Sequence, residues 1–182
     1  MDYIEDCYAR FEMAPRFYDL LVKLIEAGNT EQLQTAMECG VQMLGNRNSL
    51  YTLIFAFLTT GKYNQAKSII ETSELVAVQA RLQWYARLCI RMGLEEPLEK
   101  LIELSRNMLQ CNRDQMYHHL LTLYAKTKDW QKCMKAWSSI QEEGFKPTPR
   151  TLRLLAHVLK TNGQPIPLEV SSILENDNAG ER

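Results

Sequence analysis

The basic residues between Ser105 and Gly163 are the part of this sequence whose residue types could do chemistry. This stretch contains ten lysines and arginines against four acids, whereas the whole chain of 182 residues has a formal net charge of -1. A local excess of cations attracts phosphate groups, although a solvated helix face explains part of such an excess as well. The stretch therefore leaves two interpretations open, a strip for a polyanion and an ordinary charged surface.

The other polar residues do not form a catalytic or metal-binding set. His118 and His119 are adjacent, so on a helix their side chains point about 100° apart and cannot share a metal as residues four apart do. His157 stands alone, and the paired glutamates fall at expected helix ends, where solvated charge is usual. No Ser-His-Asp set, glycine-rich phosphate loop or paired-carboxylate signature is present. We expect no enzyme activity, no metal and no cofactor.

The cysteines and the chain ends indicate the class of protein. No two cysteines have the close spacing of a zinc site or a redox dithiol, which indicates reduced thiols in a protein that is not secreted. No apolar run approaches the roughly 18 residues of a membrane span, and the acidic start lacks a signal-peptide pattern. The chain starts and stops abruptly relative to its repeat, so we expect a fragment of a longer array. The cysteines are Cys7, Cys39, Cys89, Cys111 and Cys133.

An internal repeat organises the whole chain. Apolar residues recur at offsets of three and four, which predicts amphipathic helices. Polar breaks interrupt this pattern at intervals of 33, 32, 35 and 35 residues, as expected for an array of helical pairs. Four of the five breaks contain glycine, which closes a helix because it accepts a left-handed backbone. The breaks are centred on Gly28, Gly61, Gly93, Lys128 and Gly163.

The predicted fold class is all-α, a right-handed α-solenoid of about five helix-turn-helix repeats. We expect one helical-repeat domain over 1–174 and a disordered tail over 175–182. Stacking buries the apolar stripes that one pair cannot hide alone, and the first helix of each pair lines a concave face. A helix over 2–13 completes a preceding repeat, and a short one lies near 168–174. The remaining helices are expected at 15–27, 30–44, 47–60, 63–73, 77–92, 95–110, 114–127, 129–143 and 148–162.

The segment from Asp114 to Thr148 has marks of a known repeat. It is 35 residues long, with an aromatic residue early in helix one, a leucine pair, a small residue in helix two and a Gly-x-x-Pro ending. These residues are Tyr117, Leu120, Leu121, Cys133 and the run Glu142-Glu143-Gly144-Phe145-Lys146-Pro147. The segment resembles a pentatricopeptide repeat. The resemblance covers the last two repeats well and the first three more loosely.

A longer stretch is similar to an internal segment of a long mitochondrial member of the same family. The resemblance implies a protein of the mitochondrial matrix, with the nucleus left open as a second location. It also implies that the protein binds and stabilises mitochondrial messenger RNA and supports its polyadenylation and translation, with a small RNA-recognition-motif protein as partner. The runs that carry it are Arg81-Leu82-Gln83-Trp84, Leu98-Glu99-Lys100-Leu101, Asp114-Gln115-Met116-Tyr117, Asp129-Trp130-Gln131 and Thr151-Leu152-Arg153-Leu154-Leu155-Ala156.

The resemblance also assigns positions that would contact single-stranded RNA. In this family each repeat contacts one base with two or three side chains. One class of reader follows the helix-one aromatic residue, and the other lies at the junction to the next repeat. The residues here are not the small polar ones that the family uses, so no target sequence is predicted. The first class is Tyr18, Tyr51, Gln83, His118 and Arg153, and the second is Asn46, Val78, Arg113 and Thr148.

Less specific RNA contacts and a second function remain as hypotheses. Arg91 and Lys126 lie two residues before their breaks, where the resemblance implies salt-dependent phosphate contacts. Tyr18, Tyr51 and His118 could stack on bases at about 1–3 kcal/mol each, although both tyrosines could instead pack between repeats. The alternative function is a scaffold whose solenoid surface binds a partner protein rather than RNA.

Overall fold

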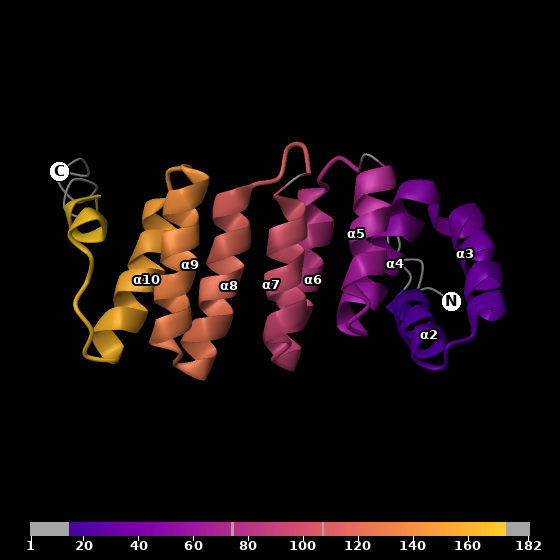
Figure 1. The fold of residues 1–182 in the computed structure, drawn as a ribbon, viewed down its shortest axis with the longest axis horizontal. Helices are drawn as coiled ribbons and strands as arrows, with labels where there is room; N and C mark the ends of the chain where they lie inside the picture. Colours follow the sequence, from indigo (N-terminus) through magenta and orange to yellow (C-terminus); the bar gives the residue numbers. More distant parts are fainter. Residues whose placement is uncertain (1–14, 74, 107, 174–182) are drawn as a thin grey trace, which may run out of the picture. The chain divides into compact units, whose positions relative to one another are not determined.

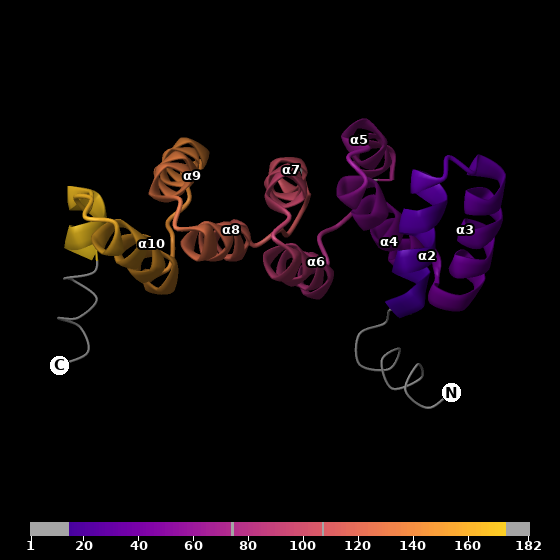
Figure 2. The ribbon, with the colours of Figure 1, turned by 90° about the horizontal axis from the view of Figure 1, so that it is seen from below.

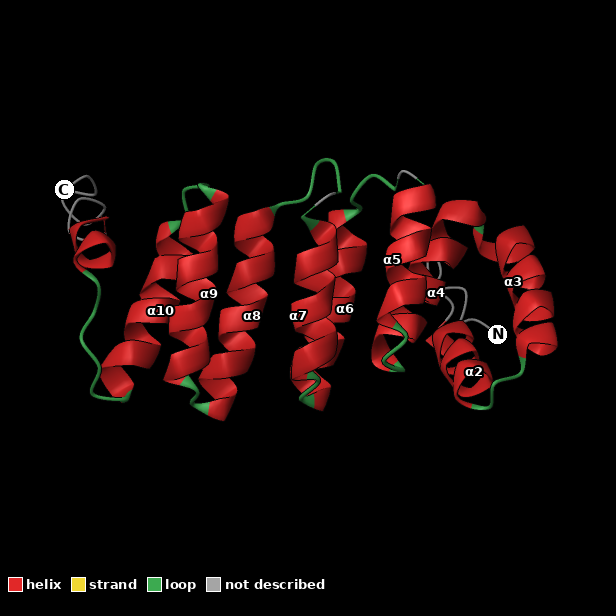
Figure 3. Ribbon diagram, in the orientation of Figure 1, coloured by secondary structure: helices red, strands yellow, loops and turns green. Residues whose placement is uncertain are grey.

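The described chain is helical throughout. The computed structural model describes residues 15–73, 75–106 and 108–173, and these ranges contain helices and turns but no strand (Figure 3). The all-α prediction is confirmed. The predicted helix over 2–13 and the predicted tail over 175–182 lie outside the described residues.

The helices follow one another with short connections (Figure 1). With one exception, their bounds agree with the predicted ranges within two residues at each end. Residues 168–173 are also helical. The labelled helices are α2 (Pro15–Glu26), α3 (Thr30–Leu44), α4 (Asn46–Thr59), α5 (Tyr63–Thr72), α6 (Gln79–Met92), α7 (Glu95–Ser105), α8 (Arg113–Thr127), α9 (Trp130–Glu143) and α10 (Pro149–Thr161).

The exception is the helix predicted over 95–110, which is five residues shorter at its C-terminal end in the structure. It ends at Ser105, and Gln110 has the left-handed φ of 61°. Tertiary contacts compete with the helix here, because the carbonyl of Leu109 accepts a 2.9 Å hydrogen bond from the backbone N–H of Ala77, while Met108 is buried. Met108 therefore packs outside a helix, while Leu109 contributes its backbone carbonyl and leaves its side chain exposed.

The chain forms two compact units. The first comprises residues 1–77 with 103–110, and the second comprises 78–102 with 111–182. In the first unit α4 packs against α2, α3 and α5; in the second α8 packs against α6, α9 and α10. Both α4 and α8 bury residues on more than one face because each contacts three helices. Within the second unit α6, α8 and α10 lie in one layer and α9 in another (Figure 2).

This arrangement confirms a helical-repeat architecture of the solenoid class, in which the first helices of successive pairs pack side by side within each unit, α2 on α4 in the first and α8 on both α6 and α10 in the second. The hand of the superhelix and the single continuous domain stay predictions. The packing explains the small side chains that recur in second helices, since Ala66 and Cys133 are fully buried. Small residues at such positions allow helices to approach closely.

The break at Lys128 shows why the other breaks carry glycine. Gly93, which ends α6, has a φ of 70°, and Lys128, which ends α8, has nearly the same left-handed conformation with a φ of 56°. The backbone N–H of Asp129 donates to the carbonyl of Tyr124, and the Asp129 carboxylate accepts from the backbone N–H of Lys132 to begin α9. These hydrogen bonds hold a conformation that costs a residue with a side chain about 1–2 kcal/mol.

Replacing Lys128 with glycine is therefore expected to stabilise the protein. The change relieves the left-handed strain, and the greater flexibility of glycine in the unfolded chain offsets part of the gain, leaving about 0.5–1 kcal/mol. Urea denaturation followed by circular dichroism measures the difference. Gly93→Ala, which introduces the same strain at the equivalent position, should shift the midpoint in the opposite direction. A destabilised Lys128→Gly variant would contradict this account of the break.

Candidate nucleic-acid interface

A groove of about 360 Å³ lies in the second unit, lined by α6, α8 and α10. Four of its lining side chains are cations, and no carboxylate is among them. The four cations are exposed, and the two histidines of the lining are half-buried. The lining residues are Arg87, Ile90, Arg91, His118, His119, Thr122, Lys126 and Arg150.

Helical periodicity places these side chains in rows. Arg87 and Arg91 are four residues apart on α6, and His118, Thr122 and Lys126 are each four apart on α8. Residues four apart lie on the same side of a helix. The packing of α8 against both α6 and α10 brings the two rows together. The spacing along each helix therefore creates the two rows of side chains, and the packing of the helices brings these rows together in one groove.

Hydrogen bonds between helices hold parts of the lining. The Lys126 ammonium donates to the backbone carbonyl of Ile90 at 3.4 Å, which ties α8 to α6. The hydroxyl of Thr151 on α10 lies 3.5 Å from Nδ1 of His118. The Lys126 side chain is still exposed, so its ammonium group keeps donors available for an anion.

The histidines contribute polarity rather than charge. Burial lowers the pKa of His119 to about 4, with further lowering by His118, Arg87 and Arg150. Burial and the nearby Arg150 also lower the pKa of His118, while Asp114 opposes this. His119 Nε2 is buried and has no hydrogen-bond partner among the described residues. At neutral pH the positive charge of the groove therefore comes from its arginines and its lysine.

Three of the predicted RNA-binding residues, Arg91, His118 and Lys126, lie in this groove. Gln83 lies one turn before Arg87 on α6, and Arg153 is an exposed residue one turn after Arg150 on α10; neither lines the groove. That any of them contacts RNA stays a prediction.

The sequence analysis did not include three residues of the lining among the predicted RNA-binding positions. These are Arg87, His119 and Arg150. The four-residue spacing of Arg87 and Arg91 indicates that both lie on the same side of a helix, so Arg87 could have been predicted beside Arg91. Nothing in the sequence indicated that Arg150 faces the same groove, because it lies on a different helix.

Tyr18 and Tyr51 lie in the first unit, and their rings are covered. Tyr18 is 8% exposed and shares a 2.7 Å hydrogen bond with the hydroxyl of Thr59, while Tyr51 is 0% exposed and donates to the carbonyl of Val76 at 2.9 Å. A covered ring offers no face for a base to stack on. In this structure both rings pack between helices, as the alternative interpretation expects, and that either tyrosine contacts RNA stays a prediction.

Two of the predicted RNA-contacting residues at the repeat junctions, Arg113 and Thr148, form hydrogen bonds with other residues of the chain. Arg113 donates from Nε and Nη2 to Glu143, each at 2.8 Å, and from Nη1 to the carbonyl of Ile102. Burial lowers the pKa of Arg113, but the hydrogen bond and charge of Glu143 outweigh it and raise the pKa overall. Thr148 donates from its backbone and its hydroxyl to the Asp114 carboxylate at 2.9 and 2.8 Å. Neither residue lines the groove.

The remaining two positions predicted at repeat junctions, Asn46 and Val78, lie at helix starts. Asn46 is exposed, and Val78 directly precedes α6.

In the described ranges no group of three or more His, Cys, Asp or Glu residues could hold a metal ion. No helix within the described ranges is long and apolar enough to cross a membrane.

The fold and this groove define a class, an all-α helical-repeat protein with a cationic surface on its first helices. Comparison with curated proteins is consistent with this class. The chain is 45% identical over 172 residues to the mitochondrial leucine-rich PPR motif-containing proteins of Mus musculus and Rattus norvegicus, and 43% identical over 179 residues to that of Xenopus tropicalis. No family model matches the chain.

These relatives are much longer than the chain. The matches cover 94–98% of this chain but only 12–13% of each relative, so the chain spans about an eighth of their length. The resemblance to a segment of the mitochondrial leucine-rich pentatricopeptide-motif protein is confirmed, and the relatives are named as mitochondrial.

Proposed function

We propose that this chain is an RNA-binding helical-repeat module and that the α6–α8–α10 groove holds the phosphates of single-stranded RNA. The observation that carries the proposal is the set of four cations without a lining carboxylate: Arg87, Arg91, Lys126 and Arg150. Such a groove concentrates polyanions because its field is not cancelled locally. The similarity to PPR motif-containing relatives supports RNA over other polyanions.

The side chains divide the work by their chemistry. The arginines present planar forks that match phosphate oxygens, while Lys126 acts as a point charge. The half-exposed ring of His118, neutral at pH 7, offers a face or an edge to a base without adding charge. Binding of this kind depends on backbone charge and stacking, so it tolerates many sequences. This agrees with the absence of the usual small polar readers.

The relatives' names support a mitochondrial location, and the rest of the wider role is what the family resemblance implies. We extend the proposal to a protein of the mitochondrial matrix, with the nucleus as a second location to test. It stabilises mitochondrial messenger RNA and supports its polyadenylation and translation, together with a small RNA-recognition-motif partner. Fractionation and RNA crosslinking of the endogenous protein test these points, and recovery of only non-mitochondrial transcripts would contradict the extension.

Reversing three charges of the groove tests the binding proposal. The variant Arg87→Glu/Arg91→Glu/Lys126→Glu should bind labelled single-stranded RNA at least about 100-fold more weakly at ~50 mM salt, because three phosphate contacts become repulsive. The slope of log affinity against log salt should also fall by about 2, at about 0.7 per phosphate for a single strand. Fluorescence anisotropy measures both quantities.

A charge-matched variant controls for bulk electrostatics. Lys128→Glu/Lys135→Glu/Lys146→Glu changes the net charge equally at exposed positions that do not line the groove. It should retain the salt slope and most of the affinity. Equal losses in both variants would show that the groove is not the site. No binding by the native chain at ~50 mM salt would reject RNA binding by this chain, since phosphate-driven affinity is greatest at low salt.

A further inference from the structure

His118 lies among cations whose charge a bound phosphate would offset. Its half-buried ring lines the α6–α8–α10 groove together with Arg87, Arg91, Lys126 and Arg150, and no carboxylate of the described residues shares that lining. Cations close to an imidazole oppose the proton that would charge it. As long as no anion is bound, the groove therefore favours the neutral form of the ring.

The charges that act on His118 come from two helices. α8, which carries His118, packs against α6, α9 and α10. Burial lowers the pKa of His118, Arg150 of α10 lowers it further, and Asp114 of α8 opposes this. α6 contributes Arg87 and Arg91 to the same groove, whereas α9 contributes none of the described lining residues. The pKa of the ring therefore lies below the ordinary value of a histidine.

The hydrogen-bond contact of His118 is compatible with either protonation state. Its Nδ1 atom lies 3.5 Å from the hydroxyl of Thr151, which lies 3.4 Å from the hydroxyl of Thr148. Thr148 in turn donates to the Asp114 carboxylate at 2.8 Å. Because a hydroxyl group both donates and accepts, Thr151 can face a bare Nδ1 or an N–H at that atom. Protonating the ring therefore does not cost this contact.

The neighbouring histidine differs from His118 in its burial. Burial, together with the charges of His118, Arg87 and Arg150, lowers the pKa of His119 to about 4. A ring with so low a pKa stays neutral over the range in which ordinary histidines titrate. Of the two histidines in the lining, His118 is thus the one that a bound anion can bring to the charged form.

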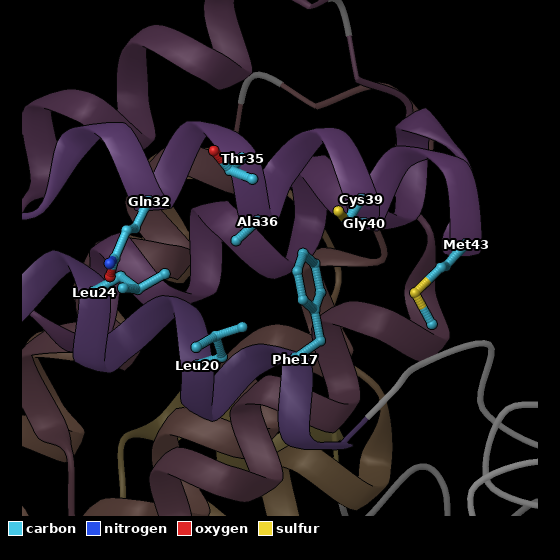
Figure 4. A pocket seen from close by; sticks show the side chains of 9 residues that line it. All are labelled: Phe17, Leu20, Leu24, Gln32, Thr35, Ala36, Cys39, Gly40 and Met43. Carbon is cyan, nitrogen blue, oxygen red and sulfur yellow. The ribbon is translucent and has the colours of Figure 1, made fainter.

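A second groove, of about 410 Å³ between α2 and α3 in the first unit, offers no comparable setting (Figure 4). Its walls are mostly apolar, with Phe17 and Leu20 on α2 and Met43 on α3. Among the described residues no histidine, lysine or arginine lines it. Since an anion is drawn to positive charge, phosphate is expected in the α6–α8–α10 groove and not in this one.

We propose that His118 takes up a proton when phosphate occupies the α6–α8–α10 groove, so that this groove binds RNA more strongly as the pH falls. This proton uptake rests on the proposed function, because a phosphate must enter the groove. The bound phosphate offsets the repulsion from Arg150 and attracts an imidazolium, which raises the pKa of His118 in the complex. The proton-linked gain in affinity is complete below the pKa of the free ring, and it is lost as the pH rises through the higher pKa of the complex.

The pH dependence of RNA affinity in the whole chain tests this coupling. The probe is labelled oligouridylate with hydroxyl ends, which has no group of its own that titrates between about pH 5.5 and about pH 8, where histidine does. Acidification across this range at ~50 mM salt should strengthen binding by the native chain at least about fivefold more than binding by His118→Gln. One phosphate and one imidazolium at ion-pair distance provide that factor even in water. Fluorescence anisotropy measures the affinities.

His157→Gln is the matched control, because His157 is exposed and does not line the groove. This variant should keep the native pH dependence, which separates His118 from the general gain of positive charge on acidification. A second measurement uses the native chain alone. NMR titration of the histidine ring protons should show that the pKa of His118 rises on saturation with oligouridylate, while that of His157 changes little.

The possible failures are distinguishable. An equal pH dependence of the native chain and His118→Gln, or a pKa of His118 that oligouridylate leaves unchanged, would overturn the coupling while RNA binding stands. Loss of the pH dependence in His157→Gln as well would assign it to bulk charge and would also overturn the coupling. Failure of the native chain to bind oligouridylate at every pH would reject the proposed function, and the coupling with it.

Discussion

Tyr51→Ala is expected to lower the free energy of unfolding by about 3–5 kcal/mol, the usual cost of truncating a buried aromatic side chain. The ring is fully buried in α4 and lies 5.8 Å from the ring of Phe55, centroid to centroid. Removing it leaves a cavity where α4 contacts its neighbours, and the carbonyl of Val76 loses its donor. Urea denaturation of the purified chain measures the change.

Tyr51→Phe separates the ring from its hydroxyl. This variant keeps the packing and loses only the hydrogen bond to Val76, so a cost of about 1 kcal/mol is expected. Neither variant should change RNA affinity under conditions where the protein is folded, because the ring is covered. A native-like stability of Tyr51→Ala together with weakened RNA binding would instead support the prediction that this tyrosine stacks on a base.

Glu143→Ala is expected to destabilise the chain by about 3–5 kcal/mol, because it leaves a mostly buried charge without its partner. The side chains of Arg113 and Glu143 are only 14% and 8% exposed. Glu143 also accepts a 2.8 Å hydrogen bond from the hydroxyl of Tyr117, and Arg113 lies over the Tyr117 ring. One carboxylate therefore supports a network that joins α8 to the end of α9.

A double variant separates the worth of the ion pair from the cost of breaking it. Arg113→Met/Glu143→Leu removes both charges, and it should recover most of the loss because apolar replacements of buried ion pairs are often neutral. The exposed pair Lys67–Glu71, at 57% and 53% exposure, gives a control, since Lys67→Ala should cost no more than about 0.5 kcal/mol. A small effect of Glu143→Ala, matching that of the exposed pair, would contradict the network's structural role.

The same ion pair explains why one predicted RNA reader failed to appear at the groove. The family resemblance placed Arg113 at a junction position. The sequence shows only that a cation stands there, whether that cation binds RNA or pairs with an acid of the same chain. Only the fold brings Glu143, 30 residues later, to within 2.8 Å of it. An arginine whose fork is already filled by a carboxylate has fewer donors for phosphate.

The groove shows a similar division between local and tertiary information. The row of Arg87 and Arg91 and the row of His118, Thr122 and Lys126 follow from spacing along single helices, and such spacing can be recognised in a sequence. Arg150 joins them because α10 packs against α8. No periodicity within one helix encodes which second helix will face it.

The sequence by itself determined the helices, their breaks and the repeat, because these depend on apolar periodicity, glycine at left-handed positions and capping residues within a few positions of one another. Tertiary structure alone decided that Tyr51 is core, that Arg113 is paired, that the helix after Glu95 stops at Ser105 and that cations from three helices share one groove. Each of these outcomes depends on residues far apart in the chain, whose contacts are set by how the helices pack.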